Sequence, residues 1–351
     1  MKKRLLILVF AGLMSLVLLP EANASAGYSD VPEEHWAAES IQRATELGYF
    51  QGVDEGRFGL GQPISRAAFS SALVRMFGWE EVRPAKSSFD DVDKTRWFYT
   101  AAETTLANGA VAAAGQDFRP DDDLTRGEMA SMLVRGLGYT SSLAETASSY
   151  GVPFSDVTVN RGFITMAYDL GLMKGKDGGR FDPDAPATRE QAAAVLVRVH
   201  DQLAASSVKL SAAGSYKLIT VATPMAEAGD EMPVTPLEPL PELYAALRRM
   251  KNNGEDMSRV ALRLMAGGVR TLTDTGGNLI GGSELISAKE VQDALAAQDV
   301  STFYSEQYQS AYCIYPPNAY QISYIWYQSD ESMAAKLQLA KLFGVTRYVL
   351  E

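Results

Sequence analysis

The stretch FDDVDKTRWFYTAAETTLANGAVAAAGQDFRPDDDLTRGEMASMLVRGLGY, residues 89–139, decides the fold because altered copies of it stand on both sides. The earlier copy spans 28–79 and the later one 154–200. Each begins with an aromatic-x-Asp-Val start and continues with a short helical pattern that stops at glycine. A Gly/Asp/Pro loop and a second helix opening on Ser-Arg or Thr-Arg follow. This order, repeated three times, predicts a repeat architecture.

The repeats carry local signals for their helix ends. In the first copy Ile41, Ala44 and Leu47 follow helical spacing, and Gly48 stands where a helix can end with a positive φ. The second helices begin after residues that favour the N-cap position, which are Ser65, Thr125 and Thr188. Thr125 and Thr188 are followed three residues later by Glu128 and Gln191, so both predict a capping box.

The second helices carry apolar stripes, such as Phe69, Leu73 and Met76 in the first copy. One amphipathic helix pair cannot bury its apolar face alone. We therefore expect the three copies to pack together around a shared axis.

These features resemble the S-layer homology family, whose pattern joins F-x-D-V-x(n)-W to an I-T-R-A-E box. The resemblance covers 28 to about 203. It implies a pseudo-trimeric bundle of helix-loop-helix repeats that binds secondary cell wall polysaccharide, often through pyruvylated sugars, in grooves between repeats. The residues that it assigns to binding are Asp30, Trp36, Gly48 and Arg66 in repeat 1, Asp91, Trp97, Gly109 and Arg126 in repeat 2, and Asp156, Gly171 and Arg189 in repeat 3.

The chemistry of the second helix start agrees with this assignment. An arginine in a first helical turn offers a planar fork of donors beside unpaired backbone N–H groups, which suits a carboxylate such as a pyruvate ketal. The alternative is that Arg66, Arg126 and Arg189 bridge aspartates for structural reasons only. Repeat 3 lacks the tryptophan and has Gly162-Phe163 in that region, so its groove is expected to be weakened or reshaped.

The first 26 residues predict a secretory signal peptide. Lys2, Lys3 and Arg4 precede an apolar run that ends before small residues in A-x-A spacing. The apolar run is shorter than the roughly 20 residues of a membrane-spanning helix. We therefore expect export, cleavage and no membrane attachment afterwards, with an uncleaved membrane anchor as the alternative.

Composition narrows the possible functions. The 351 residues carry a net charge of −11, which argues against nucleic acid as a partner. One cysteine and two histidines leave little material for disulfides or imidazole chemistry. The acid-rich loops, such as 121–123, lack a complete calcium-loop pattern, so neither a metal site nor a cofactor is expected.

The last 138 residues alternate strand-like and helical patterns, which predicts an α/β layout. The expected strands include KLITVATP, RVALRL and VTRYVL. The expected helices cover 241–251, 287–297 and 330–343, and an aromatic hairpin over 304–327 turns at Pro316-Pro317-Asn318. A polar insert is expected over 266–283. The closing stretch ISYIWYQSDESMAAKLQLAKLFGVTRYVL is similar to family 18 glycoside hydrolases, which implies part of a (β/α)8 barrel.

The activity of that family requires a D-x-x-D-x-D-x-E box, and the chain has none. Without a carboxylic acid to protonate the leaving oxygen, glycoside hydrolysis has no evident mechanism. We therefore expect no catalytic residues and no enzymatic activity. The tyrosine-rich run over 304–327 leaves two interpretations, a carbohydrate-stacking face or strand core.

The sequence thus predicts a signal peptide, three repeats, a linker and a glycosidase-like segment, with bounds 1–26, 27–82, 83–145, 146–203, 204–213 and 214–351. The predicted function is noncovalent anchoring to the cell wall of a Gram-positive-type bacterium. The expected partner is secondary cell wall polysaccharide attached to peptidoglycan. A cell-wall or chitin-type glycoside hydrolase and a structural S-layer subunit remain as alternatives.

Overall fold

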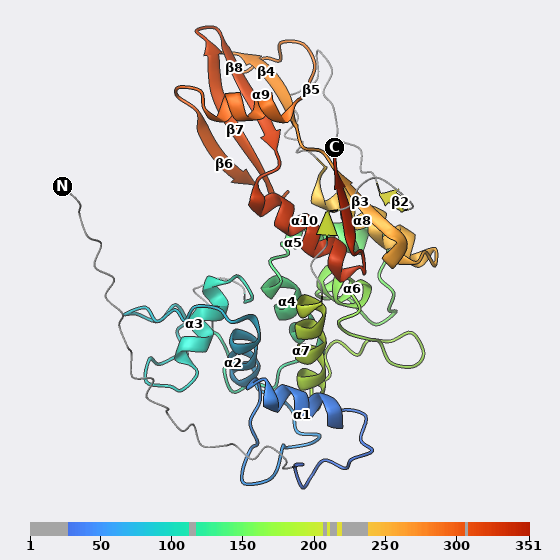
Figure 1. Cartoon of the computed structure of the whole chain (residues 1–351). Helices are drawn as coiled ribbons and strands as arrows, with labels where there is room; N and C mark the ends of the chain where they lie inside the picture. Colours follow the sequence, from blue (N-terminus) through green and yellow to red (C-terminus); the bar gives the residue numbers. More distant parts are fainter. Residues whose placement is uncertain (1–26, 112–116, 206–208, 211–215, 220–237, 306–307) are drawn as a thin grey trace, which may run out of the picture.

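The computed structural model of the chain describes residues 27–111, 117–205, 209–210, 216–219, 238–305 and 308–351. A helical N-terminal half is followed by an α/β segment, so the predicted fold class is confirmed (Figure 1). The expected signal peptide lies outside the described residues.

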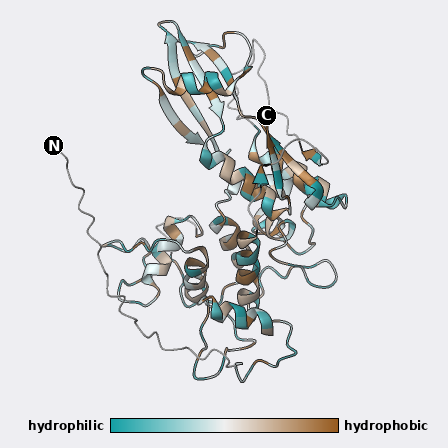
Figure 2. Cartoon of the chain, in the orientation of Figure 1, coloured by the Kyte–Doolittle hydropathy of each residue, from teal (hydrophilic) through white to brown (hydrophobic). Residues whose placement is uncertain are grey.

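Each repeat contributes two helices at the predicted places. They are α1 (Ala38–Glu46) and α2 (Arg66–Phe77) in repeat 1, α3 (Tyr99–Ala107) and α4 (Arg126–Gly136) in repeat 2, and α6 (Arg161–Asp169) and α7 (Arg189–Ala204) in repeat 3. One further helix, α5 (Ser141–Ser149), lies between repeats 2 and 3 and was not predicted. Hydrophobic and hydrophilic residues are interspersed along these helices (Figure 2), and the apolar ones contribute most of their buried positions.

The repeats close into a ring around a buried axis. The first helix of each repeat packs on the second helix of the preceding one: α3 on α2, α6 on α4, and α1 on α7. At the axis three backbone hydrogen bonds form a cycle, in which Ile64 N donates to Ala187 O (2.9 Å), Ala187 N to Leu124 O (2.8 Å) and Leu124 N to Ile64 O (2.8 Å). All three residues are buried. The expected packing around a shared axis is therefore confirmed.

The predicted caps are found with one exception. The Ser65 hydroxyl accepts from Ala68 N, and Thr125 forms a complete capping box with Glu128. The capping box predicted at Thr188 is wrong, because its side chain makes no cap hydrogen bond. Gln191 accepts instead from the Arg126 guanidinium of the neighbouring repeat.

The C-terminal segment contains a parallel sheet of four strands in the order β1-β9-β3-β2. Its strands are β1 (Lys209–Leu210), β9 (Arg347–Leu350), β3 (Val260–Leu264) and β2 (Lys217–Ile219). The predicted strands RVALRL and VTRYVL are confirmed. In the described part of KLITVATP only Ile219 is buried, since β2 is an edge strand. Strand β1 lies inside the expected linker.

A second, antiparallel sheet has the order β5-β4-β8-β7-β6. Its strands are β4 (Gly268–Asp274), β5 (Glu284–Ile286), β6 (Ser301–Ser305), β7 (Ser310–Asn318) and β8 (Gln321–Tyr327). Helix α9 (Ala288–Leu295) packs on it through Val291 and Ala294, against Cys313 and Ile325. The aromatic hairpin is confirmed as β7–β8, but both prolines lie in β7 and the chain turns at 319–320. The expected polar insert contains β4, which the sequence prediction missed.

Two helices join the halves. Helices α8 (Leu240–Asn252) and α10 (Asp330–Leu342) share one hydrophobic core with the repeats, and the short helix η1 (Met257–Arg259) precedes β3. Their side chains donate to carbonyls at the carboxyl ends of repeat helices: Lys251 to Asp169 O (2.6 Å), Gln338 to Leu137 O (2.7 Å) and Lys341 to Leu203 O (2.6 Å). Such donors suit the negative end of a helix dipole. The α/β segment is thus docked on the repeat unit.

Candidate functional site

The three motif aspartates hold the loop of their own repeat. The Asp30 carboxylate accepts from the N–H groups of Phe58 (2.7 Å), Gly59 (2.8 Å) and Leu60 (2.9 Å). Burial alone would raise the pKa of Asp30, but these hydrogen bonds hold it below its ordinary value. The equivalent contacts run from Phe118 and Arg119 to Asp91, and from Phe181 and Asp182 to Asp156.

The three motif arginines approach the same loops from the neighbouring repeat. Their Nε atoms donate to a phenylalanine carbonyl, from Arg66 to Phe118 (2.8 Å), from Arg126 to Phe181 (2.9 Å) and from Arg189 to Phe58 (2.9 Å). Each guanidinium also lies over that phenylalanine ring. Aspartate and arginine therefore do not pair directly. In each case the aspartate accepts from the N–H of a phenylalanine, and the arginine of the neighbouring repeat donates to the carbonyl of the same phenylalanine. The aspartate and the arginine therefore both have a structural role.

The first backbone N–H group of each second helix also donates a hydrogen bond. Arg66 N donates to Asp122 O (3.0 Å), Arg126 N to Ala185 O (2.9 Å) and Arg189 N to Gln62 O (3.0 Å). The first N–H group of each second helix is therefore not available to a carboxylate, because the neighbouring repeat accepts its hydrogen bond. An anion held near these arginines has to use other donors.

Two predicted residues do face solvent. The Trp36 side chain is 63% exposed and that of Trp97 is 66% exposed, which is unusual for so large an apolar side chain. Both lie directly before the first helix of their repeats. An exposed aromatic face of this kind can cover the apolar side of a sugar ring. Each ring contacts the aromatic ring next to it in sequence, Trp36 that of His35 and Trp97 that of Phe98, and its exposed part is accessible to a ligand.

The three motif glycines end the first helices. Gly48, Gly109 and Gly171 have φ values of 75°, 68° and 72°. A Cβ added at Gly48 or Gly109 would meet no atom within 4 Å, whereas one at Gly171 would lie 3.8 Å from Gln202 Nε2. The backbone conformation therefore explains the glycines at all three positions.

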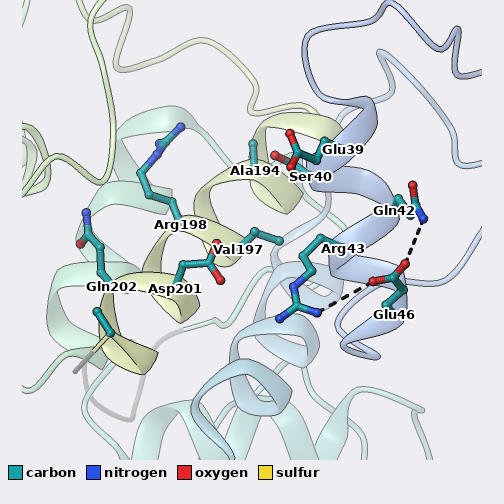
Figure 3. Close-up of a pocket in the computed structure, with 11 residues that line it drawn as sticks. Glu39, Ser40, Gln42, Arg43, Glu46, Ala194, Val197, Arg198, Asp201 and Gln202 are labelled. Atoms are coloured by element: carbon teal, nitrogen blue, oxygen red, sulfur yellow. Dashed lines mark hydrogen bonds and ion pairs between the residues drawn. The ribbon is translucent and has the colours of Figure 1, made fainter. Parts of the chain in front are cut away.

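A groove of about 750 Å³ lies between repeats 1 and 3 (Figure 3). Helix α1 provides one wall and α7 the other. The charged or amide side chains that line it are Glu39, Gln42, Arg43 and Glu46 from α1, and Arg198, Asp201 and Gln202 from α7. Gln202 places this groove beside Gly171.

The equivalent positions in the other two repeats are covered. When the glycines are aligned, Gln42 and Arg43 correspond to Glu103 and Thr104 of α3. In repeat 2 the connecting segment 80–88 covers these α3 side chains. Val82 N donates to Thr104 Oγ1 (2.9 Å), and Ser88 N donates to Glu103 Oε1 (2.8 Å). The open groove therefore distinguishes the junction of α1 with α7.

In repeat 3 the equivalent surface is filled by α5. Gly162 aligns with Glu39, and a Cβ added there would lie 1.8 Å from Ala144 O of α5. Phe163 is buried and lies under the Arg135 guanidinium, 4.3 Å from ring centroid to Cζ. The start of α6 is thus a packing surface, whereas Val159, which aligns with Trp36, is 65% exposed.

Two arginines place hydrogen-bond donors at the groove. Arg43 pairs loosely with Glu46 (Nη1–Oε2 3.9 Å), so its other donors face the groove (Figure 3). Arg198 donates to Leu172 O through one nitrogen, and burial lowers the pKa of its guanidinium. The sequence prediction missed both arginines. For Arg198 the local signal was a Leu-Val-Arg triplet that recurs in all three second helices, at Arg75, Arg135 and Arg198.

Nucleophile and metal chemistry find little support in the described part of the chain. Cys313 is fully buried, and burial raises the pKa of its thiol to about 11. No cluster of His, Cys, Asp and Glu side chains there could hold a metal ion. No described helix is both long and apolar enough to cross a membrane.

Comparison with known protein families confirms the three repeats. Residues 27–70, 88–130 and 153–193 match the S-layer homology domain. The chain is 24% identical over 203 residues to the S-layer protein sap of Bacillus anthracis, covering 58% of this chain and 25% of that protein. It is 28% identical over 250 residues to an endoglucanase of Bacillus sp. (strain KSM-635), covering 66% and 26%. The chain thus spans about a quarter of the length of these relatives.

Among solved structures, the chain is similar to the spore cortex-lytic enzyme SleL of Bacillus cereus, with a TM-score of 0.33 at 15% identity over 39% of this chain and 30% of that one. It is also similar to the sporulation-specific glycosylase ydhD of Bacillus subtilis, described as putative, with a TM-score of 0.31 at 18% identity over 38% and 43%. Likenesses this low establish neither a barrel nor an activity for the C-terminal segment.

Proposed function

We propose that this chain is a cell-surface protein of a Gram-positive-type bacterium, held noncovalently on secondary cell wall polysaccharide by its S-layer homology repeats. The observation that carries the proposal is the closed ring of three matched repeats. The similar proteins include an S-layer protein of Bacillus anthracis and an endoglucanase of a Bacillus strain, and the S-layer protein supports a surface location.

The proposed ligand contacts come from two groups of residues. Trp36 and Trp97 stack on sugar rings, while Arg43 and Arg198 attract acidic groups such as pyruvate ketals in the α1–α7 groove. The motif residues Asp30, Arg66, Asp91, Arg126, Asp156 and Arg189 support these contacts by fixing the loops. Because the chain is acidic overall, attraction to an anionic polymer has to be local.

The test is co-sedimentation of the purified protein with peptidoglycan sacculi, before and after hydrofluoric acid removes the secondary polymer. We expect binding to the untreated sacculi only. Equal binding to both preparations contradicts the proposal. The variant Trp36→Ala with Trp97→Ala should weaken binding without changing the thermal midpoint, because both rings are exposed. Tyr320→Ala is the matched control, an aromatic that is 80% exposed in the turn between β7 and β8.

The groove is tested separately with Arg43→Ala. This side chain is half-exposed, and its ion pair with Glu46 is long, so its loss should leave folding intact. We expect weaker retention on sacculi and a smaller loss of retention with added salt. If Arg43→Ala binds as the unmodified protein does, the proposed contact of Arg43 with the ligand is wrong.

The C-terminal segment is proposed to be a non-catalytic module. A glycoside hydrolase is the second candidate, because one relative is named an endoglucanase. Release of reducing ends from peptidoglycan or chitin oligomers by the full chain would favour that candidate. A structural S-layer subunit is the third candidate, and regular two-dimensional lattices of the purified protein would support it.

A further inference from the structure

The edges of the two sheets differ in how they are protected. Among the described strands, β1, β2, β5 and β6 stand at sheet edges. The first three have two or three residues and begin with a charged one, namely Lys209, Lys217 and Glu284. Short length and charge keep an edge strand from pairing with another chain. Strand β6 has the sequence Ser-Thr-Phe-Tyr-Ser, with no charge, proline or glycine.

We propose that β6 is a self-association edge, at which two copies of this chain pair antiparallel about a twofold axis. The strand is nearly palindromic around Phe303. In a register centred on that residue, Phe303 stands opposite the same residue of the second copy, Ser301 opposite Ser305, and Thr302 opposite Tyr304. Every pair is uncharged, and most of these residues favour strands. A twofold contact of this kind closes after two copies.

The side chains on one face of the sheet extend toward this edge. The Phe303 ring stacks on Tyr312 of β7, with centroids 5.1 Å apart and planes 19° from parallel. Tyr312 in turn lies 4.6 Å from Trp326 of β8. This aromatic row crosses three strands and ends at Phe303, which is 44% exposed. Directly opposed residues of an antiparallel pair share a face, so the second copy would continue the row and cover Phe303.

The expected association is weak. A five-residue edge buries far less than the roughly 1,600 Å² of a standard protein–protein interface. The net charge of −11 adds repulsion between copies. Pairing therefore needs high concentration or high salt in solution. If the repeats hold the chain on a cell wall, as proposed above, the local concentration favours pairing. The pairing itself does not depend on that location.

The first test is sedimentation velocity of the full chain from micromolar to near-millimolar concentration. We expect a monomer–dimer equilibrium. Phe303→Lys places two like charges opposite each other and should raise the dissociation constant at least about tenfold. The control is Leu285→Lys on the opposite edge strand β5, where the side chain is 54% exposed. It adds the same charge and should leave the equilibrium unchanged.

The second test determines the register in which the β6 strands of two copies pair. In a Phe303→Cys variant the new thiols of two copies face each other, so mild oxidation should produce a disulfide-linked dimer. Cys313 is fully buried and should give no background. Leu285→Cys is the control and should stay monomeric on a denaturing gel. Three results would overturn the proposal: a monomer at every concentration, a dimer that survives Phe303→Lys, or equal cross-linking of both cysteine variants.

Discussion

Removal of the Asp169 carboxylate should destabilise the whole chain, because this residue joins the repeats to the C-terminal segment. Asp169 ends α6 and is buried. Arg248 Nε lies 2.8 Å from its Oδ2, an ion pair not aligned as a hydrogen bond, and the Tyr244 hydroxyl donates to the same oxygen. Arg248 is itself buried and belongs to α8.

The magnitude follows from what Asp169→Ala leaves behind. Breaking a buried ion pair by removing one partner costs about 3–5 kcal/mol, since the remaining charge is uncompensated. Arg248 keeps its hydrogen bond to Gly151 O (2.7 Å), so we expect the lower end, about 3 kcal/mol. Removal of both partners in Asp169→Ala/Arg248→Ala should restore part of this loss.

The assay is urea unfolding followed by circular dichroism, with amide hydrogen exchange to locate the effect. Because both halves share one core, protection should fall in α6 and in α8 together. Asp54→Ala, which breaks an exposed ion pair with Arg57, is the control and should leave stability unchanged. The reasoning is refuted if Asp169→Ala behaves like this control, or if only one of the two helices loses protection.

Three further predictions concern buried positions. Gly162→Ala should lower the free energy of unfolding by about 1–3 kcal/mol, because its Cβ would collide with Ala144 O; an unchanged thermal midpoint would contradict the close packing of α5 on α6. Burial raises the pKa of Glu238 to about 7 and lowers that of Lys336 to about 8, so folded Glu238 retains a proton that the unfolded chain releases above pH 4.5. Stability should therefore fall as the pH rises from about 4.5 to about 7, and Glu238→Gln/Lys336→Met should flatten this part of the curve measured by urea titration. The Cys313 thiol should react with a thiol reagent only after denaturation, and fast labelling of the native protein would show that β7 opens.

The repeat helices were predictable because their signals are local. Caps such as Ser65 and helix-ending glycines such as Gly48 act within a few residues, so sequence spacing reports them directly. The capping box at Thr188 failed because Gln191 has a competing partner from another repeat, Arg126. Nothing in the local sequence indicates that competition.

The C-terminal segment was predicted less completely, because some of its strands depend on pairing. Strand β4 is rich in threonine and lies in a Gly/Asp/Thr stretch, yet it pairs with β8 along seven residues and buries Thr271 and Thr273. Helix α5, with the sequence SSLAETASS, has few apolar residues and is fixed by contact with α6 and α8. Tertiary contacts of this kind outweigh intrinsic propensity.

The sequence indicated residues of the candidate site but not their hydrogen-bond partners. Asp30 and Arg189 were both expected near a ligand, and they do meet at one place, on the N–H and the carbonyl of Phe58. Their partners lie 28 and 131 positions away, so sequence spacing could not indicate them. No sequence motif indicated Arg43, because it lines the groove only through the packing of α1 on α7.

The divergence of repeat 3 follows from its neighbours. Its first helix has Gly162 where repeat 1 has Glu39, and Asp169 where repeat 1 has Glu46. Glycine lets α5 approach, and the aspartate binds Arg248 of α8. Both changes turn a surface that lines an open groove in repeat 1 into one that docks other parts of the chain. The loss of the tryptophan is a separate difference, because the glycine alignment places Val159 at that position and this residue is 65% exposed rather than covered by α5.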